Sequence, residues 1–70
     1  MLKFKIIKPD QTKTEIISQG YNFKEFSNKL GVSASYLSSI LNGKRHPSPT
    51  LAKKISQELQ KDINEIFYLK

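Results

Sequence analysis

The side chains best suited to contact another molecule lie together in residues 33–46, SASYLSSILNGKRH. Ser35, Ser38, Ser39 and Asn42 recur at helical spacing, so they would share one face of a helix. Their hydroxyl and amide groups can donate and accept hydrogen bonds. Cations follow directly in the next residues. This pattern suits non-covalent recognition of a polar, anionic partner.

Catalysis is not expected from these residue types. His46 is interpreted as a loop residue, because no nucleophile, paired carboxylates or glycine-rich phosphate loop accompanies it. Cysteine is absent, which excludes a disulfide and a thiolate zinc site, and one histidine cannot hold a metal alone. We therefore predict no enzyme activity, no metal, no cofactor and no small-molecule ligand.

The charge balance favours a polyanionic partner. The 70 residues carry a formal net charge of +6, and the pI is about 9.7. A basic protein that neutralises phosphates releases condensed counterions, which favours nucleic acid as a partner. The sequence has no signal-peptide pattern and no apolar run long enough to span a bilayer, so a cytoplasmic, nucleoid-associated location is expected.

The N-terminal segment has two interpretations. Residues 2–7 alternate, with Leu2, Phe4 and Ile6 on one side, which predicts a strand. Residues 12–17, TKTEII, are rich in β-branched side chains and predict a returning strand, so residues 2–18 are expected to form a β-hairpin. The alternative is a short helix over residues 11–19, capped by Asp10.

Helical signals dominate after this segment. Asn22 is a good N-cap, Glu25 completes a capping box, and Tyr21 can pack across the cap onto Phe26. Gly31 is placed to end that helix. Further helices are predicted after Ser33, after Ser48-Pro49 and after Asp62, and their apolar stripes include Leu37, Ile40, Leu41, Leu51, Ile55, Leu59, Ile63, Ile66 and Phe67.

The first two of these helices meet four requirements of a helix-turn-helix. Ser27 is small where the helices cross, and Gly31 tolerates a positive φ in the turn. Val32 plugs the corner, while Leu37 and Ile40 anchor the second helix. This geometry lays the second helix in the major groove of DNA.

Residues 21–68 resemble the Cro/C-repressor (lambda-repressor-like, XRE-type) helix-turn-helix family. Besides the four offsets, the resemblance rests on the motif SASYLSSILNGKR, on Pro-Ser-Pro at 47–49 and on INEIF at 63–67. It implies a mainly α, small lambda-repressor-like domain with an N-terminal β-hairpin replacing the family's first helix. Residues 1–70 are then a single DNA-binding domain, with the hairpin in residues 1–20 and the helices in residues 21–70.

The resemblance also assigns contacts on double-stranded DNA. Four residues match the family's base-reading positions: Ala34, Ser35, Ser38 and Ser39. The expected contacts with the DNA backbone come from Asn22, Lys24, Tyr36, Asn42, Lys44 and Arg45. For Asn22 a capping role can coexist with a phosphate contact, and Tyr36 is equally compatible with packing against the neighbouring helix.

The expected function is sequence-specific regulation of transcription, as a bacterial repressor of phage or mobile-element type, with a homodimer on a palindromic operator. The alternatives are an antitoxin-type autorepressor, a recombination accessory factor, and a protein-interaction module that uses the hairpin edge or the apolar tail at residues 66–69. Unlike many family members, the chain has no glycine in residues 59–62, between the last two predicted helices.

Overall fold

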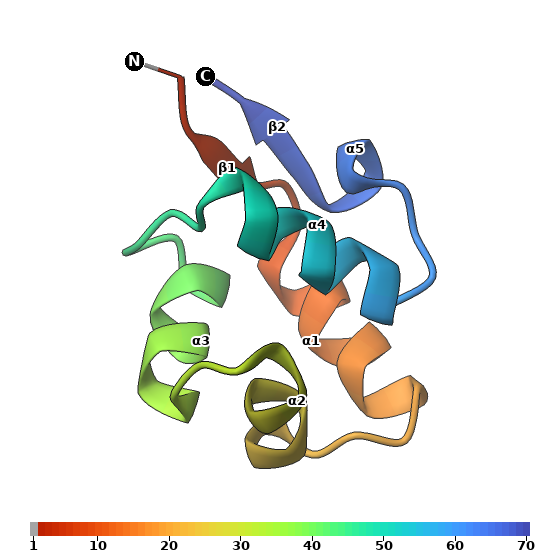
Figure 1. Cartoon of the computed structure of the whole chain (residues 1–70). Coiled ribbons are helices and arrows are strands. Elements are labelled where there is room, and N and C mark those ends of the chain that lie inside the picture. Colours follow the sequence, from red (N-terminus) through yellow and green to blue (C-terminus); the bar gives the residue numbers. More distant parts are fainter. Residues whose placement is uncertain (1) are drawn as a thin grey trace.

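The computed structural model describes residues 2–70, and within them five helices accompany one two-stranded sheet. Figure 1 shows the helices gathered in one body, with the strands forming a ribbon at one end, beside both termini. The elements in chain order are β1 (Phe4–Ile6), α1 (Pro9–Ser18), α2 (Phe23–Leu30), α3 (Ala34–Leu41), α4 (Pro49–Glu58), α5 (Ile63–Ile66) and β2 (Phe67–Leu69). The prediction of a mainly helical fold is confirmed.

One hydrophobic cluster holds the helices together. Every helix supplies at least one fully or nearly fully buried apolar side chain, and the largest of them come from α2 and from the start of β2. The inward stripes predicted for the last three helices are confirmed in their main members. The buried apolar set is Ile16, Phe26, Leu30, Leu37, Ile40, Leu41, Leu51, Ala52, Ile55, Leu59, Ile66 and Phe67.

The predicted N-terminal hairpin is wrong, because residues 9–18 form helix α1. Pro9 stands at the start of the helix, where its fixed φ is favourable and its missing N–H costs nothing. Thr12 and Ile16, four residues apart, are both buried, while Ile17 is 68% exposed. Helical spacing therefore places Ile16 in the core. The alternative helix is confirmed in type, although Asp10 lies in its first turn and does not cap it.

The strand predicted in residues 2–7 does exist, but its partner comes from the other end of the chain. β1 pairs antiparallel with β2, in a register that places Phe4 opposite Leu69 and Ile6 opposite Phe67. The rings of Phe4 and Phe67 meet edge to face, 6.2 Å apart. Leu2, expected on the core side, is 68% exposed because it lies beyond the paired strand.

Side-chain caps start α2, α3 and α4 at the predicted positions. The Asn22 side chain accepts from the Glu25 N–H at 2.8 Å, and the Glu25 carboxylate accepts from the Asn22 N–H at 2.9 Å. The ring of Tyr21 lies 5.2 Å from that of Phe26. Ser33 and Ser48 cap α3 and α4. Local sequence thus sets where α2, α3 and α4 begin, whereas Asp62 precedes α5 without a side-chain cap.

The ends of α1, α2, α3 and α4 share one hydrogen-bonding pattern, the Schellman motif, which needs a left-handed residue. After α2, the Val32 N–H bonds the Ser27 carbonyl at 3.0 Å, and Gly31 has a φ of 78°. After α4, the same pattern occurs with Gln60 at a φ of 57°. The absent glycine therefore leaves the turn intact, with a glutamine in a conformation that favours glycine.

Candidate nucleic-acid interface

Helices α2 and α3 are joined by the tight turn that the sequence predicted. Ser27 is 1% exposed, and its hydroxyl donates to the Lys24 carbonyl at 2.8 Å, so its small side chain is satisfied where the helices meet. Val32 packs partly buried against the core. Leu37 and Ile40 anchor α3 from within, at 0% and 1% exposure. The inner face of α3 is therefore fixed, and its other face is left at the surface.

The outer face of α3 carries the predicted base-reading residues. Ala34 and Ser35 are exposed, and Ser38 and Ser39 are half-buried. The buried hydroxyls of Ser27 and Ser56 donate to carbonyls of their own helices. By contrast, within residues 2–70 the hydroxyls of Ser35, Ser38 and Ser39 donate to no protein acceptor. The protons of these three hydroxyls are therefore available to an external partner.

The loop after α3 presents its cations on a well-ordered backbone. Gly43 has a φ of 78°, and the N–H groups of Lys44 and Arg45 both bond the Ser39 carbonyl, at 2.9 and 3.2 Å. Both side chains are exposed. The Arg45 guanidinium lies over the Tyr36 ring, 5.2 Å from its centroid. The loop cations therefore adjoin the seryl face directly.

Tyr36 packs, half-buried, against the hydrophobic cluster. This contact supports the packing interpretation of Tyr36 and makes its ring the support for Arg45. A cation over an aromatic face gains roughly 0.5–1 kcal/mol at an exposed site. The Tyr36 hydroxyl forms no hydrogen bond within the described part of the chain, so a phosphate contact remains open to it.

Asn22 and Lys24 stand apart from the seryl face, at the start of α2. Figure 1 shows α3 lying between α2 and the loop that leads to α4. Both residues are exposed. The capping box uses the N–H groups of Asn22 and Glu25, so those of Phe23 and Lys24 are the ones left for a phosphate. The Glu25 carboxylate beside them opposes an anion at this end.

Asn42, predicted to contact the DNA backbone, is already engaged within the protein. The Lys13 ammonium, from α1, donates to the Asn42 Oδ1 at 2.9 Å. The Asn42 Nδ2 in turn donates to the Ser38 hydroxyl at 3.4 Å. Sequence reasoning missed Lys13, because the assignment of residues 12–17 to a strand separated it from α3. Only the alternative prediction, a helix over residues 11–19, could have placed Lys13 beside α3.

The charges along this side favour an anion. Residues 33–48 contain Lys44, Arg45 and His46 and no aspartate or glutamate. His46 is half-buried in the loop, next to the buried Pro47.

No helix of the described residues is long and apolar enough to cross a membrane. In the same residues no group of three or more histidine, cysteine or acidic side chains could hold a metal ion.

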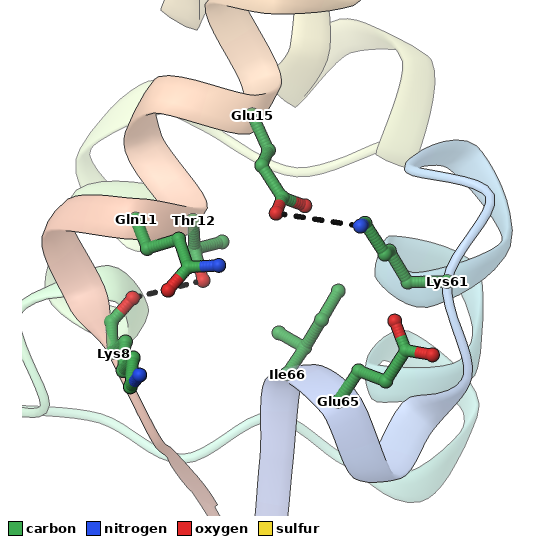
Figure 2. A pocket seen from close by; sticks show the side chains of 7 residues that line it. All are labelled: Lys8, Gln11, Thr12, Glu15, Lys61, Glu65 and Ile66. Carbon is green, nitrogen blue, oxygen red and sulfur yellow. Dashed lines mark hydrogen bonds and ion pairs between the residues drawn. The ribbon is translucent and has the colours of Figure 1, made fainter.

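A hollow between α1, the turn after α4 and α5 lies outside this interface. Figure 2 shows Glu15 and Lys61 pointing toward each other across it, and their ion pair measures 3.6 Å. The cavity measures about 50 Å³, which has room for little more than water. Its lining contains no residue of α3 or of the basic loop. The hollow is therefore a small gap between packed elements rather than a ligand site.

The comparisons with known proteins agree with this geometry. A family model described as Helix-turn-helix matches residues 13–66, well over half of the chain. No curated protein and no solved structure gives a match. The family consists of DNA-binding regulators that are typically not enzymes. The chain therefore belongs to the XRE-type helix-turn-helix family of Cro- and C-repressor-like DNA-binding proteins.

Proposed function

We propose that residues 1–70 act as one DNA-binding domain that recognises specific double-stranded sequences and represses transcription, with α3 in the major groove. The observation that carries this proposal is the outer face of α3. That face holds three serine hydroxyls whose protons have no acceptor within residues 2–70, on a helix anchored from behind by Leu37 and Ile40. Donors without an acceptor of their own, on the outer face of a fixed helix, are suited to hydrogen-bond base edges.

Direct reading of bases by this face is modest. Ala34 is suited to contact a thymine methyl group, whereas Ser35, Ser38 and Ser39 can each donate to or accept from more than one base. Serine makes no bidentate pair, so each contact discriminates less than an arginine–guanine pair does. The shape of the DNA and bridging waters therefore supply much of the specificity.

Affinity comes mainly from the phosphate backbone. Lys44 and Arg45 are exposed beside the C-terminal end of α3, and Lys24 is exposed at the start of α2. These cations would contact phosphates on either side of the groove, together with polar groups of Asn22, Tyr36 and Asn42. Three neutralised phosphates would give a slope of log K against log salt concentration of about −2.7.

Two copies on a palindromic operator would place their α3 helices about 34 Å apart. The end of the molecule that carries the ribbon offers exposed apolar side chains for such pairing: Leu2 and Leu69 are 68% and 53% exposed, and Tyr68, on the opposite face of its strand from Leu69, is 44% exposed. We place the protein in the cytoplasm, at the nucleoid, as a regulator of phage or mobile-element type.

Selection from a random duplex pool tests the function. The purified full chain is expected to enrich one sequence family with twofold symmetry, and the binding constant for it should fall steeply with salt. Sedimentation in the same buffer gives the stoichiometry of the complex. Enrichment of no sequence, together with salt-independent binding, would contradict sequence-specific recognition.

A second candidate is a protein-interaction module, and an antitoxin-type autorepressor would combine such a module with DNA binding. The observation that favours it is the pair of exposed leucines at the end of the ribbon, Leu2 and Leu69. Such a protein would co-purify with a toxin-sized partner from cells that encode both, and Leu69→Ser would release that partner without changing duplex affinity. An interaction module alone should show no more than weak, non-specific duplex binding.

A further inference from the structure

Lys13 connects α1 with the DNA-facing side of α3. The proposed function gives this lysine no role. Its side chain is partly buried, and its ammonium donates to the Asn42 Oδ1 at 2.9 Å. The only ion pair in the described residues joins Lys61 and Glu15, so no carboxylate neutralises Lys13. Its charge therefore lies beside the C-terminal end of α3, where the helix dipole favours a cation.

The lysine decides which way the Asn42 amide points. An ammonium group can only donate hydrogen bonds, so the amide oxygen must face Lys13 and the amide nitrogen must face away. That nitrogen lies 3.4 Å from the Ser38 hydroxyl oxygen and donates to it. Two hydrogen bonds thus connect Lys13 on α1, through Asn42 at the end of α3, to Ser38 on the outer face of α3.

The hydrogen bond from Asn42 also affects how the Ser38 hydroxyl can bind another molecule. Asn42 donates to one lone pair of the Ser38 oxygen, so the Ser38 proton points away from Asn42 and is available to an acceptor elsewhere. No acceptor for that proton occurs within residues 2–70, unlike the proton of Ser27, which the Lys24 carbonyl accepts. Ser38 is therefore presented outward as a hydrogen-bond donor.

We propose that Lys13 is a positioning residue of the DNA-binding face: acting through Asn42, it holds the Ser38 hydroxyl as a donor toward an acceptor on a base edge. This inference rests on the proposed function. In the major groove guanine, adenine and thymine present acceptor atoms, whereas cytosine presents only a donor. On the strand that Ser38 faces, cytosine is therefore the disfavoured base.

The contact can first be tested without DNA. In the ¹⁵N-labelled full chain, Lys13→Met should shift the Asn42 side-chain amide resonances, and Lys13→Arg should largely preserve them because arginine also donates. Lys53→Met removes the same charge from a hollow that no α3 residue lines, so it should leave them unchanged. Unchanged Asn42 resonances in Lys13→Met would overturn the proposal.

The second test uses the duplex selected by the wild-type chain. The base pair read by Ser38 is the one at which Ser38→Ala loses discrimination against cytosine, by about 3- to 10-fold for one hydrogen bond. Lys13→Met should lose a similar factor at that pair alone, and the double variant Lys13→Met/Ser38→Ala should lose no more. The salt slope of Lys13→Met should equal that of Lys53→Met.

Two outcomes would contradict the positioning role of Lys13. If Lys13→Met weakens binding to every sequence alike and adds fully to Ser38→Ala, Lys13 is a phosphate contact and the positioning role is wrong. If the thermal midpoint falls but discrimination at that pair is retained, the contact is structural only. A wild-type chain that enriches no sequence would remove the proposed function, while the amide resonances would still report whether Lys13 orients Asn42.

Discussion

The guanidinium of Arg45 lies over the ring of Tyr36, with its Cζ 5.2 Å from the ring centroid. Tyr36 belongs to α3 and packs against the hydrophobic cluster, whereas Arg45 is exposed in the following loop. The ring therefore gives the loop cation a defined place beside the outer face of α3.

Arg45→Ala should weaken binding to all duplexes alike, because a phosphate contact carries no sequence information. The slope of log K against log salt concentration should become shallower by up to about 0.9. Fluorescence anisotropy at several salt concentrations measures both effects, with Lys53→Met as a charge-matched control. An unchanged slope would remove Arg45 from the interface.

Substitutions of Tyr36 separate its ring from its hydroxyl. If the ring positions Arg45, Tyr36→Phe should bind within about 2-fold of the wild-type chain, since the cation–π contact survives. Tyr36→Leu should lose affinity by about 2- to 5-fold, equivalent to roughly 0.5–1 kcal/mol. A loss in Tyr36→Phe as large as in Arg45→Ala would instead indicate a phosphate contact through the hydroxyl.

Ser39→Ala should change the preferred sequence rather than the salt slope. Its half-buried hydroxyl lies on the outer face of α3, and one lost hydrogen bond to a base is expected to alter discrimination by about 2- to 10-fold. Repeating the selection with Ser39→Ala and with Ser35→Ala shows which base positions lose their preference. If both variants select the wild-type sequence with the same stringency, this face does not read bases.

Gln60→Gly should stabilise the protein. Gln60 has a φ of 57°, where a side chain costs roughly 1–2 kcal/mol, and glycine relieves that cost at some loss of chain entropy. A net gain of about 1 kcal/mol would raise the thermal midpoint by roughly 4–8 °C.

The matched control is Gln57→Gly, at an exposed position inside α4. There glycine should lower stability by about 1 kcal/mol. Equal and negative effects at both positions would show that the turn after α4 gains nothing from glycine.

Helix starts, helix ends and the helix-turn-helix were predictable because their determinants lie within a few residues of one another. Asn22 and Glu25 cap α2 reciprocally, and Gly31 takes the left-handed φ that its place after Leu30 predicted. Leu37 and Ile40 are buried as their spacing required. The same local pattern placed the serines of α3 on its outer face, where Ser35 is exposed and Ser38 and Ser39 are half-buried.

Tertiary structure decided the N-terminal third and its link to the site. The β-branched residues in 12–17 suit either a strand or a helix, and burial of Ile16 against the other helices selects the helix. β1 finds its partner in residues 67–69, across almost the whole chain, where no local pattern specifies pairing. The contact of Lys13 with Asn42 depends on both choices, since side chains so distant in sequence meet only when the packed core brings α1 against α3.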